Sequence, residues 1–168
     1  MNHTAILSDC QRFRYRLSRH WGGGPYLLFV MLNPSTTDGE VDDATIRRCI
    51  GFAQRAGYGG FDVVNLYAYR ATKPRELRLA GYPVGADNDK HILNAATACA
   101  AYCLAWGANA HELERPSQVL PLLRQTGKPI FCLRITSKGQ PEHPLMLPSS
   151  CVLTPFTLDA ISEAMAKK

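Results

Sequence analysis

Short apolar runs alternate with longer segments of helical spacing along most of the chain. Four runs are apolar almost throughout, which is typical of parallel strands covered on both faces, because neither side of such a strand meets water. They span residues 26–32, 61–66, 103–106 and 129–133. Helices are expected between them, over residues 43–57, 91–101 and 116–126.

Local signals support the ends of these helices. Asp43 is a typical N-cap residue, and Gly57 follows the last apolar positions of the same segment. The acidic run at 87–89 precedes the Ala-rich second helix, and Pro116 suits the first turn of the third. The alternation predicts an α/β fold, a three-layer α/β/α sandwich around a central, mainly parallel four-stranded sheet. Ligands of such a sheet bind at the carboxyl ends of its strands.

Residues 12–17 alternate basic with apolar side chains. This period of two predicts a strand with one wet and one buried face, and we expect it to add to the sheet as an N-terminal antiparallel edge strand. The densest basic cluster of the chain lies here and comprises Arg12, Arg14, Arg16 and Arg19. On one strand face, these side chains would either follow a phosphate backbone or protect an exposed edge from aggregation.

Composition narrows the class of protein. The 168 residues are 46% hydrophobic and 20% charged, which suits one globular domain over 1–168 and excludes disordered and collagen-like chains. The net charge of +5 permits a polyanionic partner. No apolar run approaches the ~20 residues of a membrane-spanning helix, and the first residues do not resemble a signal peptide, so we expect a cytoplasmic protein.

The six cysteines are scattered and contain no CxxC pair. Most lie in apolar segments, so free buried thiols are expected rather than a disulfide framework, a zinc site or a cluster. A metal held by Glu40, Asp42 and Asp43 is a weaker alternative, because an N-cap with neighbouring acidic residues explains this segment without an ion. We therefore expect no metal and no cofactor.

Polar residues gather where the predicted strands end. Asn33, Pro34 and Ser35 follow the first apolar strand, and Asn65 ends the second. Trp106 and Gly107 end the third strand, and His143 lies in the loop after the fourth. Because the carboxyl ends of parallel strands share one edge, we expect these residues to converge on one site.

The same residues resemble known families. Met31-Leu-Asn-Pro-Ser35, the Asp-Asp-x-Thr-Ile-x-Arg motif at 42–48, Val-Asn-Leu-x-Ala at 64–68 and His-Pro-Leu at 143–145 resemble a bacterial domain family of unknown function, family 1643. The order of Asn33-Pro34, Asn65, the Leu-Ala-Trp-Gly corner and His143-Pro also resembles, more distantly, the uracil-DNA glycosylase superfamily.

The second resemblance implies an enzyme that hydrolyses the N-glycosidic bond of a base flipped out of DNA. It implies that Asn33 orients the attacking water, that His143 donates a hydrogen bond to the departing base, and that Asn65 reads the base edge. Pro34, Ser35, Trp106 and Gly107 would complete the substrate site. Contacts to DNA are expected from Arg70, Lys73 and Lys138, together with Arg12, Arg14 and Arg16.

Two departures from the superfamily pattern bear on the substrate. No aromatic residue follows the first motif until Phe52, and the late motif is His-Pro-Leu rather than His-Pro-Ser. We therefore expect a modified or damaged base rather than plain uracil, in DNA repair or phage defence. Two alternatives stay open: an enzyme of free nucleosides or nucleotides on the same fold, and a nucleic-acid-binding module without catalysis.

Overall fold

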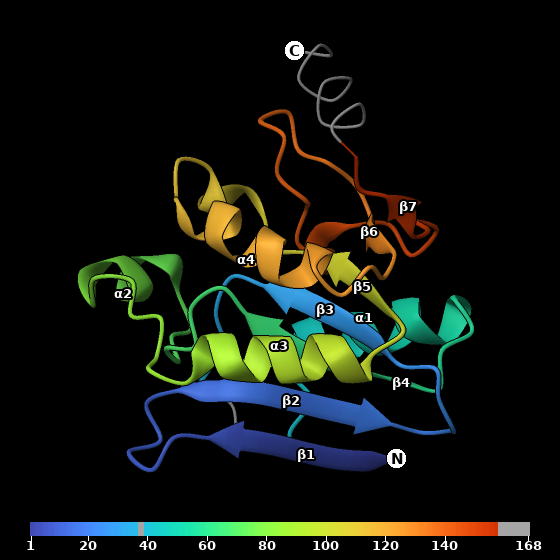
Figure 1. The fold of residues 1–168 in the computed structure, drawn as a ribbon, viewed down its shortest axis with the longest axis horizontal. Coiled ribbons are helices and arrows are strands. Elements are labelled where there is room, and N and C mark those ends of the chain that lie inside the picture. Colours follow the sequence, from blue (N-terminus) through green and yellow to red (C-terminus); the bar gives the residue numbers. More distant parts are fainter. Residues whose placement is uncertain (37–38, 158–168) are drawn as a thin grey trace.

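A computed structural model describes residues 1–36 and 39–157, which form a mixed α/β structure with one seven-stranded sheet and four α-helices (Figure 1). The order of strands across the sheet is β1-β2-β4-β3-β5-β6-β7. The strands are β1 (Asn2–Leu7), β2 (Arg14–His20), β3 (Leu27–Met31), β4 (Gly60–Asn65), β5 (Ala101–Leu104), β6 (Ile130–Cys132) and β7 (Thr154–Pro155). The helices are α1 (Ala44–Arg55), α2 (Pro74–Leu79), α3 (Asn88–Ala98) and α4 (Arg115–Arg124).

The centre of the sheet matches the prediction from apolar runs. β4, β3, β5 and β6 are neighbours and parallel, and all five residues of β3 are buried. Apolar side chains cover both faces of these strands. One cluster packs the sheet against α1, and the other packs it against α3 and α4. The arrowheads of β3 and β4 point to the side of the molecule where α2 lies (Figure 1).

The sheet is larger than the four strands and one edge strand that the sequence predicts. β2 pairs with β1 on one side and β4 on the other, so it is an internal strand. β1 forms the true edge, and β7 pairs antiparallel to β6 at the opposite edge. The sequence of β1, NHTAIL, lacks a strong apolar or alternating pattern, because an exposed edge strand buries few side chains.

A β-bulge distorts β2 beside its start. Ile6 lies opposite Arg16 and Leu7 opposite Arg14, which leaves Tyr15 as the extra residue. A bulge re-aims the side chains around it. The Tyr15 ring stacks on His91 of α3 at 4.8 Å between ring centroids, whereas Arg14 lines a cavity at the carboxyl edge of the sheet.

The predicted ladder of arginines on one strand face is therefore wrong. Arg12 is exposed in the loop before β2, and Arg14 is buried beside the bulge. Arg16 forms an ion pair with Asp62 of β4. The alternating pattern in the sequence does not reveal the bulge. One inserted residue moves every side chain before it to the opposite face of the strand.

The helix that follows the first apolar strand begins and ends as predicted. The carboxylate of Asp43 accepts a hydrogen bond from the Ile46 N–H at 2.9 Å. Gly57 follows the helix with a φ of 86°, a conformation that glycine adopts without steric strain. α3 ends at Ala98, three residues before the predicted end, because Ala101 already pairs in β5. The short helix α2 has no counterpart in the prediction.

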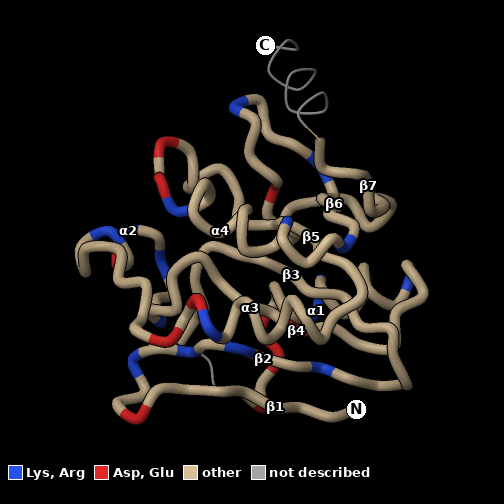
Figure 2. The backbone as a smooth tube through the Cα atoms, viewed as in Figure 1, with Lys and Arg blue, Asp and Glu red and all other residues tan. Residues whose placement is uncertain are grey.

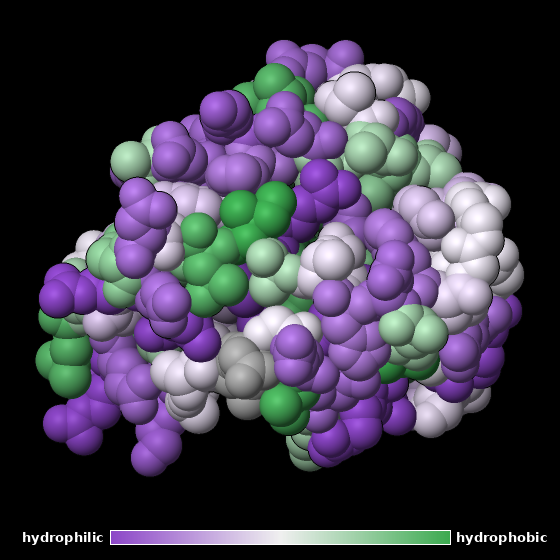
Figure 3. All heavy atoms as spheres, turned by 90° about the horizontal axis from the view of Figure 1, so that it is seen from below, coloured by the Kyte–Doolittle hydropathy of each residue, from purple (hydrophilic) through white to green (hydrophobic). Residues whose placement is uncertain are grey.

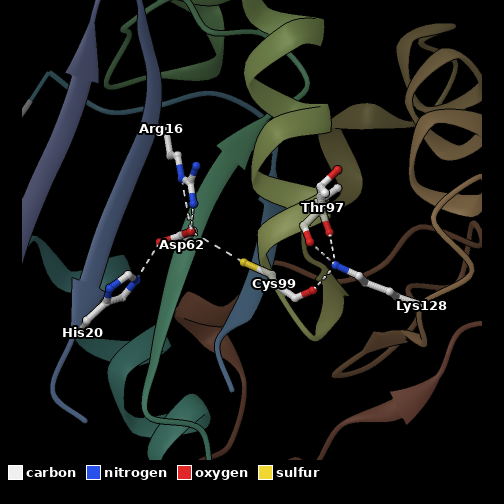
Figure 4. Close-up of polar contacts among 7 residues, drawn as sticks. Arg16, His20, Asp62, Thr97, Cys99 and Lys128 are labelled. Carbon is white, nitrogen blue, oxygen red and sulfur yellow. Dashed lines mark hydrogen bonds and ion pairs between the residues drawn. The ribbon is translucent and has the colours of Figure 1, made fainter. Parts of the chain in front are cut away.

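A polar cluster lies between β2, β4 and α3 (Figure 4). Asp62 is only 1% exposed and pairs with Arg16 and with His20, whose Nε2 is 2.9 Å from the carboxylate. The thiol of Cys99 donates to the same carboxylate at 3.5 Å. Next to it, the Lys128 ammonium group donates to carbonyls at the end of α3, where the helix dipole favours a cation.

The Asp62 cluster predicts a loss of stability in acid. Burial raises the pKa of Asp62, but hydrogen bonds from Ser18 and Arg16 outweigh it, so the pKa lies below its ordinary value of 3.8. Such a group stabilises the fold above its unfolded pKa, and this contribution disappears as the pH falls through the folded pKa. In urea unfolding, we expect D62N to be less stable than wild type at pH 7, with the difference shrinking below pH 3.8.

The matched control is D9N, because Asp9 is exposed. A free-energy difference between wild type and D62N that stays constant from pH 7 to pH 3 would contradict the assignment.

Charged residues are distributed over several elements rather than collected on one. Figure 2 shows basic residues on β2, on α2 and in loops, with acidic residues among them. The face seen in Figure 3 is mainly hydrophilic, with apolar residues in small separate patches. No helix in the described part of the chain is long and apolar enough to cross a bilayer.

Candidate functional site

A cavity of about 340 Å³ opens at the carboxyl ends of β3, β4 and β5, beside the start of α1. This volume lies near the lower end of the range of roughly 300–1,000 Å³ for small-ligand sites. The structure brings together there six of the seven residues that the sequence assigns to catalysis and substrate binding, namely Asn33, Ser35, Asn65, Trp106, Gly107 and His143. Pro34 does not line the cavity, although its carbonyl helps to hold Asn33.

The side chain of Asn33 has a fixed orientation. Its Nδ2 donates to the carbonyls of Pro34 at 3.0 Å and Ala71 at 2.8 Å. Two carbonyl partners require the NH₂ group on that side, so the amide cannot be flipped without losing both bonds. The Oδ1 atom is left as an acceptor at the cavity wall, suited to hold a water molecule or a ligand N–H.

Asn65 is the most unusual polar residue of the site. It is 2% exposed, lines the cavity, and neither atom of its carboxamide has a hydrogen-bond partner among the described residues. Buried polar groups are nearly always paired, so an unpaired donor and acceptor side by side indicate a place for a ligand. A planar group with one acceptor and one donor would satisfy both atoms.

The backbone around Asn65 is held firmly. The buried Asn88 Nδ2 at the start of α3 donates to the carbonyls of Asn65 and Leu66 at 2.9 and 3.2 Å. Arg115 at the start of α4 donates to the Leu66 carbonyl at 2.7 Å and pairs with Asp89. Two helix starts thus fix the end of β4, which gives the free carboxamide a defined position.

His143 is held as a neutral hydrogen-bond donor. Its Nδ1 accepts the Leu145 N–H at 3.1 Å, which leaves the proton of the neutral ring on Nε2. Burial lowers the pKa of His143 below 6.5, and the nearby Asp43 opposes this shift only in part. Gly107 permits the close approach of this ring, because a Cβ at 107 would lie 3.2 Å from the His143 Cβ.

Two further side chains of the cavity are committed to their neighbours. The Ser35 hydroxyl donates to the Asp43 carboxylate at 2.8 Å, which links the first motif to the start of α1. The Trp106 Nε1–H donates to Gln140 at 2.9 Å, which fixes the indole plane. Asp43 is therefore both a helix cap and a cavity-lining carboxylate, a second role that the capping signal in the sequence does not reveal.

Arg14 lines the cavity, although the sequence places it on a DNA-facing strand surface. In the sequence, Arg14 is one of several basic residues that alternate with apolar ones, so no local signal distinguishes it from Arg12 or Arg16. The direction of its side chain depends on the bulge, which the sequence does not reveal.

The other basic residues expected to contact DNA do not line the cavity. Lys73 precedes α2 and is exposed, and Lys138 is exposed in the loop after β6. Arg70 donates to the carbonyls of Gln11 and Thr36 at 2.9 and 2.7 Å and so ties two loops together beside the site.

The residues weighed as metal ligands have other partners. Asp42 pairs with Arg19 at 2.7 Å, and Asp43 caps α1. The described residues contain no group of three or more His, Cys, Asp or Glu side chains that would hold a metal ion. All six cysteines are free; four are buried, whereas Cys10 is exposed and Cys151 is half-buried.

Fold and cavity together define a mixed α/β protein with a polar pocket at the carboxyl ends of the central parallel strands. Residues 14–145 match the family described as "protein of unknown function (DUF1643)", and the chain belongs to this family. The matched stretch contains every residue that lines the cavity. No curated protein and no solved structure matches the chain.

Proposed function

We propose that this protein hydrolyses the N-glycosidic bond of a modified or damaged base in DNA. The observation that carries the proposal is the shared cavity of Asn33, Asn65 and His143, in which each residue presents a different polar function. An acceptor on Asn33, an unpaired carboxamide on Asn65 and a neutral donor on His143 are the groups that such a reaction needs.

In the proposed reaction, a water oxygen bonds to the sugar carbon as that carbon's bond to the base nitrogen breaks. The bonding electrons leave with the base, and the transition state resembles an oxocarbenium ion. The Oδ1 of Asn33 accepts a hydrogen bond from the water and orients it. The water loses one proton to solvent or to the departing base.

The departing base carries the negative charge that the broken bond leaves behind. His143 stabilises this charge by donating its Nε2–H to a base oxygen. The neutral ring already carries this proton on Nε2, so it donates the hydrogen bond with no change in its protonation state. The carboxamide of Asn65 pairs with the edge of the base and selects it.

The chemistry of the cavity wall also bears on the choice of base. Among the described residues, Trp106 is the one Phe, Tyr or Trp that lines it, and its Nε1–H donates to Gln140. With no ring supplied by the segment after Asn33-Pro34 in the described residues, a base with polar substituents suits the site better than plain uracil. The resemblance to the uracil-DNA glycosylase superfamily, with its α/β/α sandwich, supports the proposal through the same short motifs.

A second candidate function is an enzyme of free nucleosides or nucleotides. It is favoured by the positions of Arg12, Lys73 and Lys138, none of which lines the cavity. A nucleic-acid-binding module without catalysis is the third possibility and requires the fewest of the site's features.

The proposal predicts abasic sites in base-modified DNA. Purified protein is incubated with single-stranded and duplex oligonucleotides, each with one modified base, and with the matching free deoxynucleosides. Alkali-labile cleavage at one base class is expected, and N33A should reduce the rate about a hundredfold, because the attacking water loses its position.

N94A is the matched control, because Asn94 is exposed on α3. Base release from free deoxynucleosides alone would favour the second candidate. DNA binding without release of any base would favour the third.

A further inference from the structure

Arg14 differs from the other two buried arginines near this edge of the sheet. Arg19 is fully buried and pairs with Asp42, and Arg115 pairs with Asp89 and donates to a backbone carbonyl. Arg14 is 4% exposed, and its buried Nε has no hydrogen-bond partner among the described residues. A buried cation without hydrogen-bond partners destabilises a folded protein, unless a ligand supplies them.

The surroundings of Arg14 leave it charged. Burial lowers its pKa to about 10, the Asp43 carboxylate acts in the opposite direction, and the nearby Arg70 and Arg19 lower the pKa further. A pKa near 10 still means a full positive charge at neutral pH. The Asp43 carboxylate already accepts hydrogen bonds from Ser35 and the start of α1, so it offsets the charge only from a distance.

Arg14 and Asn65 reach one cavity from neighbouring strands. Leu17 lies opposite Val63 in the pairing of β2 with β4, and beyond this pair the Arg14 N–H donates to the Ala68 carbonyl, so the start of β2 runs along the segment that follows Asn65. Both side chains line the same cavity, and both carry buried polar atoms without a partner in the described chain. The wall of this cavity therefore offers both a cation and an unpaired carboxamide.

We propose that Arg14 binds an anionic oxygen on the base that Asn65 reads, so that the cavity accepts bases that carry or acquire negative charge and rejects cationic, alkylated bases. This inference rests on the proposed function, in which a base enters the cavity.

The charges of the site agree with this assignment. Arg14 is cationic, and the hydrogen bond to Nδ1 keeps His143 a neutral donor. Both favour negative charge on the bound base, whether it comes from an acidic substituent or from the departing base itself. A cationic base in this cavity would meet the guanidinium of Arg14, and the two like charges would repel each other.

The test is direct binding by titration calorimetry, which needs no catalysis. The probes are 5-carboxyuracil as an anionic base, uracil as its neutral counterpart and 1-methyladenosine as a cationic nucleoside. We expect 5-carboxyuracil to bind at least tenfold more tightly than uracil, and 1-methyladenosine not to bind. R14M should remove most of the preference for 5-carboxyuracil, whereas R124M, at an exposed position at the end of α4, should keep it.

A structural role for Arg14 would give a different result. If Arg14 serves the ligand, R14M without ligand should melt at the same temperature as wild type or higher, because the variant removes a buried, unpartnered charge. If Arg14 serves the fold, R14M should melt lower and keep the wild-type order of affinities. R14Q provides a second neutral variant should R14M fail to fold.

Three results would overturn the inference: no binding of 5-carboxyuracil at millimolar concentration, equal binding of the anionic and cationic probes, or unchanged preference in R14M and R14Q. Binding of inorganic phosphate or deoxyuridine monophosphate that requires Arg14, without binding of 5-carboxyuracil, would assign Arg14 to a phosphate instead. If no DNA base is released but the expected order of affinities appears, the proposed hydrolysis fails and the assignment of Arg14 stands.

Discussion

Replacing His143 with alanine is expected to lower the rate of base release by about 10²–10³-fold, the loss typical of removing one donor to a developing anion. The reason is the fixed tautomer: Nδ1 accepts the Leu145 N–H, so the one nitrogen-bound proton of the neutral ring is on Nε2. The measurement is single-turnover release of the base from the oligonucleotide identified in the screen.

The pH dependence of the rate of base release is a second test of the role of His143. Because burial lowers the pKa of His143, the neutral donor persists at pH 6.5, and protonation is expected to change the rate only below that value. H3A is the matched control, because His3 is exposed on β1. If H143A retains the wild-type rate, His143 has no part in the chemistry.

Replacing Asp42 with alanine is expected to destabilise the fold by about 3–5 kcal/mol, because it leaves the fully buried Arg19 without its carboxylate. For a chain of this size, the melting temperature should fall by roughly 10 °C. Thermal and urea unfolding measure the change, with D9A as the exposed control.

The double variant D42A/R19M separates a structural ion pair from other roles of Asp42. Methionine has a similar length and no charge, so most of the lost stability should return once the unpaired cation is removed. If the double variant is as unstable as D42A alone, the stability supplied by Asp42 does not come from its pairing with Arg19.

The elements that the sequence predicts best are those whose signals are local. The mainly apolar run at 61–66 predicts a strand that the structure has as β4 over Gly60–Asn65, and the capping carboxylate of Asp43 with Gly57 brackets α1 closely. The edge strand β1 and the bulge at Tyr15 were out of reach for a different reason. They depend on pairing between distant segments, which leaves little trace in either segment alone.

Most residues of the candidate site can also be predicted from the sequence. Asn33, Asn65 and His143 each follow or end an element whose direction the alternation predicts, and they meet in one cavity. The sequence does not predict the position of Arg14 in that cavity, because a regular strand without the bulge would direct its side chain to the other face. The second role of Asp43 was hidden by its capping signal, which explains the residue without reference to a ligand.

Side chains of β4 that serve the polar cluster and the cavity lie on opposite faces of the strand. Asp62 faces the cluster beneath α3, and Asn65, three residues later, faces the cavity. An odd spacing puts them on opposite sides, so a slip of one residue in the pairing of β4 would turn the salt-bridged carboxylate to the cavity face and the unpaired amide away from it. A slip that brought Phe61 to the place of Gly60 would be blocked, because a Cβ there would lie 2.7 Å from the Arg19 carbonyl oxygen. A glycine at the far end of the strand thus protects the alignment of the proposed chemistry.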